Sequence, residues 1–146
     1  LCTIVSKAMR KDLRDRYVRY LAEEIQHSGT GRKAVMPGIR QILDALEARH
    51  DVLLGLLTGN FKSGARVKLG HFDLWRYFRC GAFGDDAADR NALVPFAVRR
   101  AEACGLPTIS PRDVIVVGDT PSDVACAHAG EAVAVASAAM RSGPEK

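Results

Sequence analysis

The sequence has few of the patterns that bind a structural metal, build a disulfide framework or cross a membrane. Its four cysteines contain no C-x-x-C pair, and its four histidines show no H-x-x-x-H or Cys/His zinc spacing. The longest apolar stretches span about six residues, far fewer than the 18 or more of a membrane helix. These absences exclude a zinc module and a small disulfide-rich protein, and they favour free thiols in a reducing cytoplasm.

The chain does have the length and composition of one globular domain. It has 146 residues, of which 47% are apolar and 26% are charged. At this length a folded chain buries about 68–70% of the surface that its unfolded form exposes, so it needs no metal or disulfide to hold a core. Neither G-x-G-x-x-G nor G-x-x-x-x-G-K-[ST] occurs, which leaves a receiver-like or nucleotide-binding domain without support.

The net charge of +4 is concentrated in the first third of the chain, where residues 1–50 carry ten basic and six acidic side chains. Asp12 and Asp15 interrupt the basic residues at helical spacings of three and four, which favours a solvated helix face stabilised by ion pairs. A surface for nucleic acid or another acidic partner is the alternative. Most of this charge comes from Lys7, Arg10, Lys11, Arg14, Arg16 and Arg19.

Apolar periodicity predicts helices that alternate with short apolar strands. Such alternation indicates βαβ units and a parallel sheet, and strands without polar alternation are typical of a sheet covered on both faces. The best domain boundary is the linker over residues 29–36. Helices are predicted over 8–28, 37–50, about 61–69, from about 93 to just before Gly105, and about 121–129. Strands are predicted over 52–57, 79–84, 114–117 and 132–136.

Polar residues follow two of these strands directly. Thr58-Gly59-Asn60 comes after the first, and Asp119 and Asp123 come after the strand 114–117. A hydroxyl and free N–H groups at such a turn can hold a phosphate oxygen, and two carboxylates four residues apart can converge on Mg²⁺. Simpler alternatives are a turn or helix N-cap at Asp119 and a helix cap at Thr58.

Both turns resemble motifs of the haloacid dehalogenase superfamily, in particular its phosphoglycolate-phosphatase-like branch. Leu57-Thr58-Gly59-Asn60 is similar to the second motif, and the segment 117–123, V-G-D-T-P-S-D, is similar to the fourth. The resemblance spans about residues 15–137. It implies a three-layer Rossmann-like α/β core with a parallel sheet over residues 34–146, preceded over residues 1–33 by the end of a helical cap.

The resemblance also implies a chemistry and a role for each residue. Phosphoryl transfer would go through an aspartyl-phosphate and be assisted by Mg²⁺. Thr58, Gly59 and Asn60 would bind the phosphoryl group, Asp119 would ligate the metal, and Asp123 would ligate it or orient its shell. The family's usual K-P-x-P context is absent. The resemblance carries its cationic role to Arg90, with Lys62 and Lys68 as weaker candidates. The alternative is that Arg90 is a surface residue that pairs with Asp86 or Asp89.

One family motif is missing, because the sequence contains no D-x-D pair and therefore no nucleophile of the family type. The strand that bears this motif would lie between the strands ending at Thr58 and at Asp119, so its absence leaves two strand edges to be paired or covered. A truncated fragment, one chain of a split assembly and an incompletely determined sequence are the alternatives. The start at Leu1, within the cap, favours part of a longer enzyme.

The leading hypothesis is therefore a Mg²⁺-dependent hydrolase of small phosphorylated metabolites, inactive as these 146 residues alone. Another chain or segment would complete the sheet. The alternative is a non-catalytic module that uses its basic first helix to bind nucleic acid or another acidic partner.

Overall fold

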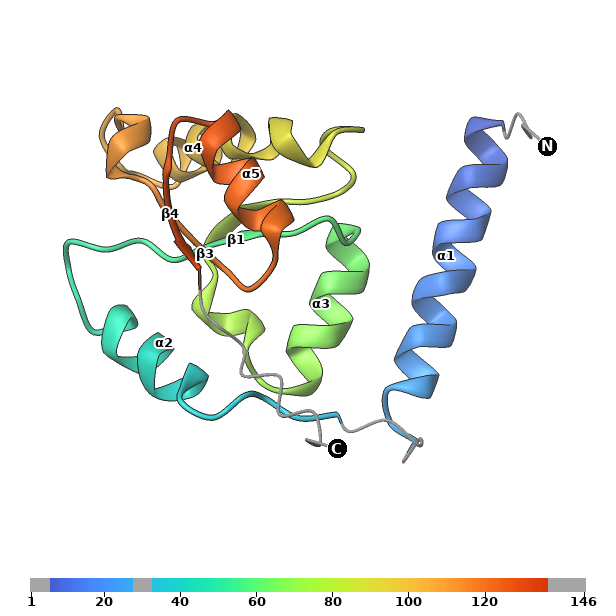
Figure 1. Cartoon of the computed structure of the whole chain (residues 1–146). Helices are drawn as coiled ribbons and strands as arrows, with labels where there is room; N and C mark the ends of the chain where they lie inside the picture. The colour runs from blue at the N-terminus through green and yellow to red at the C-terminus, as the bar shows by residue number, and fades with distance from the viewer. Residues whose placement is uncertain (1–5, 28–32, 137–146) are drawn as a thin grey trace, which may run out of the picture. The chain divides into compact units, whose positions relative to one another are not determined.

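The computed structural model describes residues 6–27 and 33–136 (Figure 1). Five α-helices are found among them, α1 (Lys7–Glu24), α2 (Ile39–Glu47), α3 (Lys62–His71), α4 (Leu93–Ala103) and α5 (Pro121–Ala129). The strands are β1 (Gly55–Leu57), β2 (Cys80–Ala82), β3 (Ile115–Gly118) and β4 (Val133–Ala136), and three single 3₁₀ turns are η1 (Trp75–Tyr77), η2 (Arg90–Ala92) and η3 (Pro111–Asp113).

The predicted order of helices and strands is confirmed, and the elements are mostly shorter than expected. The first helix ends at Glu24 rather than near residue 28, and β1 has three residues instead of six. Residues 28–32 of the predicted linker lie outside the described residues. None of the helices in the described ranges is long and apolar enough to span a membrane.

The described residues form two compact units. One contains α1, α2, α3 and η1, and the other contains the four strands with α4, α5, η2 and η3. This division differs from the boundary at residues 33 and 34 that the sequence suggests, because residues 34–52 and 60–77 group with α1. The assignment of a cap and a core stays a prediction.

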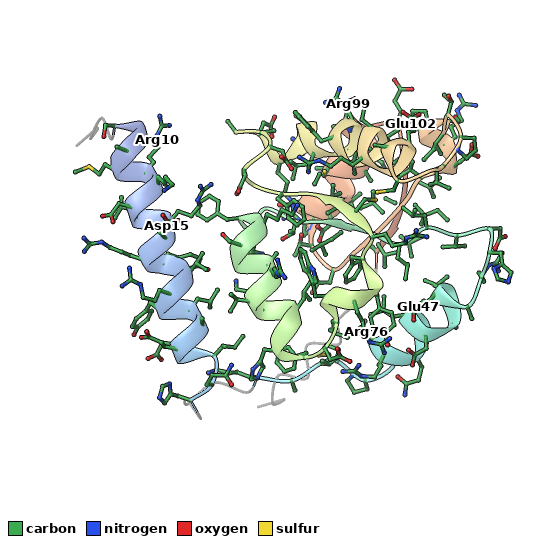
Figure 2. All side chains as sticks on the ribbon, turned by 180° about the vertical axis from the view of Figure 1, so that it is seen from behind. Arg10, Asp15, Glu47, Arg76, Arg99 and Glu102 are labelled. Atoms are coloured by element: carbon green, nitrogen blue, oxygen red, sulfur yellow. The ribbon has the colours of Figure 1, made fainter. Side chains whose placement is uncertain are left out.

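In the first unit, α1 packs on α3 through an aromatic and an aliphatic side chain. The side chains of Tyr17 and Leu21 lie against Gly64, and the Tyr17 ring meets Phe61 edge to face with centroids 6.4 Å apart. On the exposed side of α1, Asp12 pairs with Arg16 at 2.9 Å and Asp15 with Lys11 at 3.7 Å. Figure 2 shows charged side chains, Arg10 and Asp15 among them, spread along the helix. These pairs are the ones that the spacing predicts for a solvated helix face.

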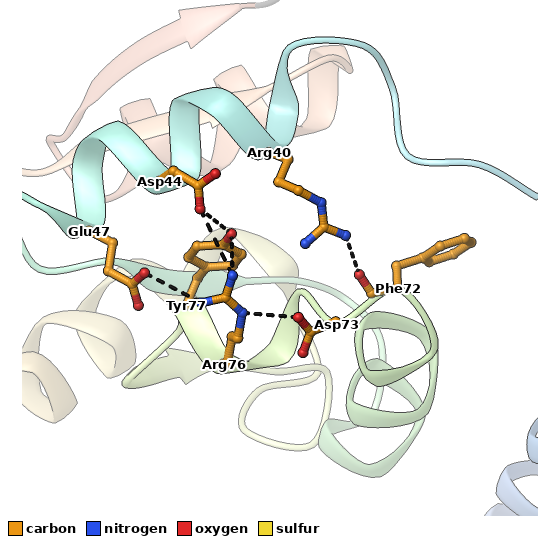
Figure 3. Close-up of polar contacts among 7 residues, drawn as sticks. All are labelled: Arg40, Asp44, Glu47, Phe72, Asp73, Arg76 and Tyr77. Atoms are coloured by element: carbon orange, nitrogen blue, oxygen red, sulfur yellow. Dashed lines mark hydrogen bonds and ion pairs between the residues drawn. The ribbon is translucent and has the colours of Figure 1, made fainter.

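A polar cluster joins α2 to the segment after α3 (Figure 3). The buried Tyr77 donates its hydroxyl proton to the Asp44 carboxylate, and the Arg76 guanidinium lies 4.2 Å from the centre of the Tyr77 ring. Arg76 also pairs with Asp73 at 3.1 Å and with Glu47 at 3.6 Å. The bond to Asp44 and burial raise the pKa of Tyr77, so the phenol stays protonated and holds α2 in place.

In the second unit the strands form two separate parallel pairs, β1–β2 and β3–β4. Helix α4 packs on β1 and β2, helix α5 packs on β3 and β4, and the two helices contact each other on one side of the strands (Figure 1). Leu93 and Val94 of α4, Val116 of β3 and Cys126 of α5 belong to one buried cluster. The parallel strands and their helical layer confirm the α/β class.

The prediction that β3 is buried on both faces is wrong for this structure. Val116 is 8% exposed, whereas its neighbours Ile115 and Val117 are 62% and 68% exposed. Side chains alternate between the two faces of a strand, and α5 covers only one of them. An apolar run such as Ile115–Val117 therefore predicts a strand, but it does not show that both faces of the strand are covered by the described residues.

Candidate functional site

Thr58 is held at the carboxyl end of β1. Its backbone N–H donates to the Ala82 carbonyl oxygen at 3.0 Å, which extends the β1–β2 ladder by one residue beyond Leu57. The N-cap of α3 is Phe61 and has no side-chain cap bond, so Thr58 is not a helix cap. Gly59 and Asn60 follow in an exposed bend, which leaves the turn accessible to a ligand.

Asn60 is joined to a lysine of α3. Its side-chain oxygen accepts a hydrogen bond from the Lys68 ammonium at 2.9 Å. Lys68, a weaker candidate by sequence, is therefore the cation bonded to this turn. The eight-residue separation spans a bend and two helical turns, so no local spacing rule would have ranked Lys68 above Lys62.

The turn after β3 is organised by a capping box. The Thr120 hydroxyl accepts from the backbone N–H of Asp123 at 3.3 Å, and the Asp123 carboxylate accepts from the Thr120 N–H at 3.0 Å and from the Thr120 hydroxyl at 2.7 Å. Pro121 fits the first helical position, where no N–H is needed. Thr120 is thus the cap, and the interpretation of Asp119 as the N-cap is wrong. The Asp119 residue lies exposed at the end of β3.

Loss of the Thr120 hydroxyl should weaken this turn. We expect Thr120→Val to lower the free energy of unfolding by about 1 kcal/mol, the usual cost of an N-cap, while Thr120→Ser should stay close to the wild type. Urea denaturation followed by circular dichroism measures both. A serine variant as unstable as the valine variant would show that the methyl group, rather than the hydroxyl, matters here.

Arg90 is bonded to Asp123. The Arg90 guanidinium donates to the second Asp123 oxygen, and the carboxylate side chain is only 13% exposed. Burial by itself raises the pKa of Asp123, but the bonds from Thr120 and the charge of Arg90 outweigh it and hold the pKa below its ordinary value. The sequence suggested Asp86 or Asp89 as structural partners of Arg90, and both suggestions are wrong. Asp86 pairs with Arg100, and Asp89 caps η2.

Gly118 allows β3 and the Asp123 side chain to approach closely. A Cβ atom at this position would collide with the Cβ and carboxyl carbon of Asp123. Glycine is needed here for space rather than for a special backbone angle. A larger residue before Asp119 would therefore displace the Asp123 side chain that organises this turn.

A protein-family model described as haloacid dehalogenase-like hydrolase matches residues 3–136. The chain belongs to the haloacid dehalogenase-like hydrolases. A solved structure of a haloacid dehalogenase-superfamily hydrolase, subfamily IA, variant 1, from Geobacter sulfurreducens PCA is similar to it, with 28% identity and a TM-score of 0.56. The match covers 70% of this chain and 50% of that protein, so the chain spans about half of its length. No curated protein matches the chain.

Family membership confirms the resemblance seen in the two turns. The narrower likeness to the phosphoglycolate-phosphatase-like branch stays a prediction. Within this haloacid dehalogenase-like chain, the structure brings Arg90, Thr120 and Asp123 together through direct bonds. Thr58 and Asp119 follow strands of two different two-stranded sheets, so the hydrogen bonds of one sheet do not fix the distance between them.

A metal ion at the end of β3 would have few protein ligands among the described residues. Those residues contain no group of three or more His, Cys, Asp or Glu arranged as a metal cage. Mg²⁺ commonly keeps several waters and binds one or two carboxylates together with substrate oxygens. The exposed Asp119 suits such a site, whereas both Asp123 oxygens are already bonded. Of the two roles that the resemblance implies for Asp123, ligating the metal or orienting its shell, these bonds favour the second.

Sequence reasoning missed the bond network at the end of β2. Arg100 of α4 donates to both carboxylate oxygens of Asp86 at 2.6 Å and to the Gly81 carbonyl at 2.6 Å. These bonds connect α4 to β2 and to the loop that follows it. The partners are 14 and 19 residues apart, so no motif spacing reveals them.

Proposed function

We propose that this haloacid dehalogenase-like chain provides the phosphate-binding turn and the metal-binding turn of a Mg²⁺-dependent phosphomonoester hydrolase. The observation that carries the proposal is the exposed Asp119 beyond β3, on a turn that Thr120 and Asp123 hold in place. Thr58 occupies the equivalent position beyond β1. Ligands of parallel α/β sheets bind beyond the carboxyl ends of the strands, which supports this pair of turns.

Each residue has a distinct role in the proposal. The Thr58 hydroxyl and the N–H groups of Gly59 and Asn60 bind phosphoryl oxygens. Asp119 holds Mg²⁺, which supplies positive charge to the transferring group when bound. Asp123 fixes the turn, since its carboxylate is committed to Thr120 and Arg90.

Arg90 is proposed as the cation of the site. Its ion pair with Asp123 keeps a guanidinium beside the turn that carries Asp119. The Arg90 Nε atom is buried and has no hydrogen-bond partner in the described part of the chain. The Arg90 side chain as a whole is 36% exposed, so the charge of its guanidinium can act on a negatively charged ligand at this end of the unit.

The attacking carboxylate is proposed to come from a strand outside these 146 residues, because the chain contains no D-x-D pair. The carboxylate would displace the alcohol from phosphorus, the alcohol would leave with a proton, and water would then release phosphate from the acyl phosphate. We propose that the same strand pairs with β1 and β3. Support comes from the division of the strands into two separate pairs, β1–β2 under α4 and β3–β4 under α5.

The 146-residue chain by itself should not hydrolyse an aryl phosphate in the presence of Mg²⁺. A form of the protein that includes the D-x-D strand should hydrolyse it, because only that form contains the attacking carboxylate. Release of p-nitrophenol, measured on both forms at verified mass, tests the expectation. Turnover by the 146-residue chain that persists through a second purification step would place the nucleophile within these residues.

A further inference from the structure

Two thiols meet where β2 begins and α4 ends. Cys80 is the first residue of β2 and is half-buried, and Cys104 is the exposed C-cap of α4. The Cys104 Sγ atom lies 3.8 Å from the carbonyl oxygen of Arg79, one peptide unit before Cys80. Burial raises the pKa of the Cys80 thiol, and the charge and hydrogen bonding of the Cys104 thiol raise it further. The contact with the Arg79 carbonyl therefore places the Cys104 sulfur beside the start of β2, where Cys80 is the first residue.

The third described cysteine has a different environment. Cys126 is fully buried and donates its thiol hydrogen to the Arg90 carbonyl oxygen at 3.1 Å. Cys80 is half-buried and Cys104 is exposed, so an oxidant in solution can reach this pair, whereas Cys126 is enclosed. Access to solvent is one of the conditions for a thiol to react. Reactivity is thus expected at the Cys80–Cys104 pair and not at Cys126.

We propose that Cys80 and Cys104 form a reversible disulfide, with a low-molecular-weight disulfide such as oxidised glutathione as the oxidant. The exposed Cys104 thiolate attacks one glutathione sulfur, which breaks the S–S bond and releases one glutathione thiolate. The Cys80 thiolate then attacks the Cys104 sulfur and releases the second glutathione. Two protein thiols lose two electrons and two protons, and the oxidant leaves as two reduced glutathione molecules.

The bond would tie the first residue of β2 to the end of α4. It closes a loop that contains Leu93 and Val94 of the buried cluster. A cross-link of this kind stabilises a protein by restricting its unfolded chain, so the oxidised form should unfold at a higher urea concentration than the reduced form. Because β2 pairs with β1, the cross-link also fixes the strand that ends at Thr58. The inference does not depend on the proposed hydrolase activity.

Trypsin digestion makes the test direct, because each cysteine falls in a different peptide. Cys80 lies in residues 80–90, Cys104 in 101–112, Cys2 in 1–7 and Cys126 in 113–141. The folded 146-residue chain is incubated with oxidised glutathione, the remaining thiols are alkylated after unfolding, and the digest is analysed by mass spectrometry. We expect peptides 80–90 and 101–112 to be joined, and Cys126 to be alkylated.

Two serine variants and one solvent condition act as controls. Cys80→Ser should retain glutathione on Cys104, and Cys104→Ser should leave Cys80 largely unmodified because it is less accessible. In concentrated urea the specific 80–104 link should fall to a minor fraction of mixed pairings. The proposal is overturned if the folded wild type retains glutathione on Cys104 without a link, or if the link forms equally well in urea.

Discussion

We expect Mg²⁺ to raise the melting temperature of the 146-residue chain, and we expect replacement of Asp119 with asparagine to abolish that rise. In a form of the protein that includes the D-x-D strand, the same replacement should lower kcat/KM for an aryl phosphate by at least about a hundredfold. Replacing a residue that only hydrogen-bonds to a metal ligand typically lowers metal affinity or activity by about 10–100-fold. Replacing the ligand itself should lower the activity by at least as much. The amide keeps the size of the side chain and removes the charge that attracts the cation.

Asp113→Asn is the matched control. Asp113 is an exposed aspartate in η3, shortly before β3 begins, whereas Asp119 follows directly after β3. Its replacement therefore makes the same chemical change near the other end of the strand. It should leave both the Mg²⁺-dependent melting shift and the hydrolysis near the wild-type values. Equal losses in the two variants would indicate a general effect of charge and would refute the metal role of Asp119.

Truncation of Leu93 to alanine should lower the free energy of unfolding by about 2–5 kcal/mol, the range for large-to-small changes in a protein core. Leu93 has no exposed surface and belongs to the buried cluster in which α4, α5, β2 and β3 meet. The cavity left behind has no solvent to fill it, and the helices that line it are held by other contacts. Urea denaturation of the variant and the wild type measures the difference.

Leu13→Ala removes the same atoms from an exposed site on α1, where the leucine is 55% exposed. It should cost much less, because little apolar surface there leaves water on folding. Domains of this size are stable by only about 5–15 kcal/mol, so the core variant should show a clearly lower urea midpoint. A Leu93 variant as stable as the Leu13 variant would show that α4 does not pack on the strands as described.

Among the described residues, β1 pairs only with β2, and one face of β3 is exposed to solvent. Parallel strands are normally covered on both faces and paired on both edges, because their backbone groups and apolar side chains are costly to leave in water. Val116 is covered by the helical layer while Ile115 and Val117 are not. Within the described residues, these strands therefore keep apolar side chains of β3 in contact with solvent.

Local chemistry in the sequence determined the order of the elements and the position of both turns. Apolar periodicity and the glycines and prolines between segments predicted helices such as the one over about 121–129, which is α5 in the structure. They also placed Thr58 and Asp119 directly after strands. The absence of a D-x-D pair was also readable from the sequence alone. Each of these features depends on neighbouring residues, whose preferences act over a few positions.

Tertiary structure alone decided which residues meet across the fold. It paired Arg90 with Asp123 rather than with Asp86 or Asp89, and it brought Cys104 beside the start of β2. It also divided the strands into two pairs and left one face of β3 open. These partners are separated by as many as 33 residues, and only the packing of α4 and α5 on the strands brings them into contact, because spacing rules carry no information about where distant segments pack.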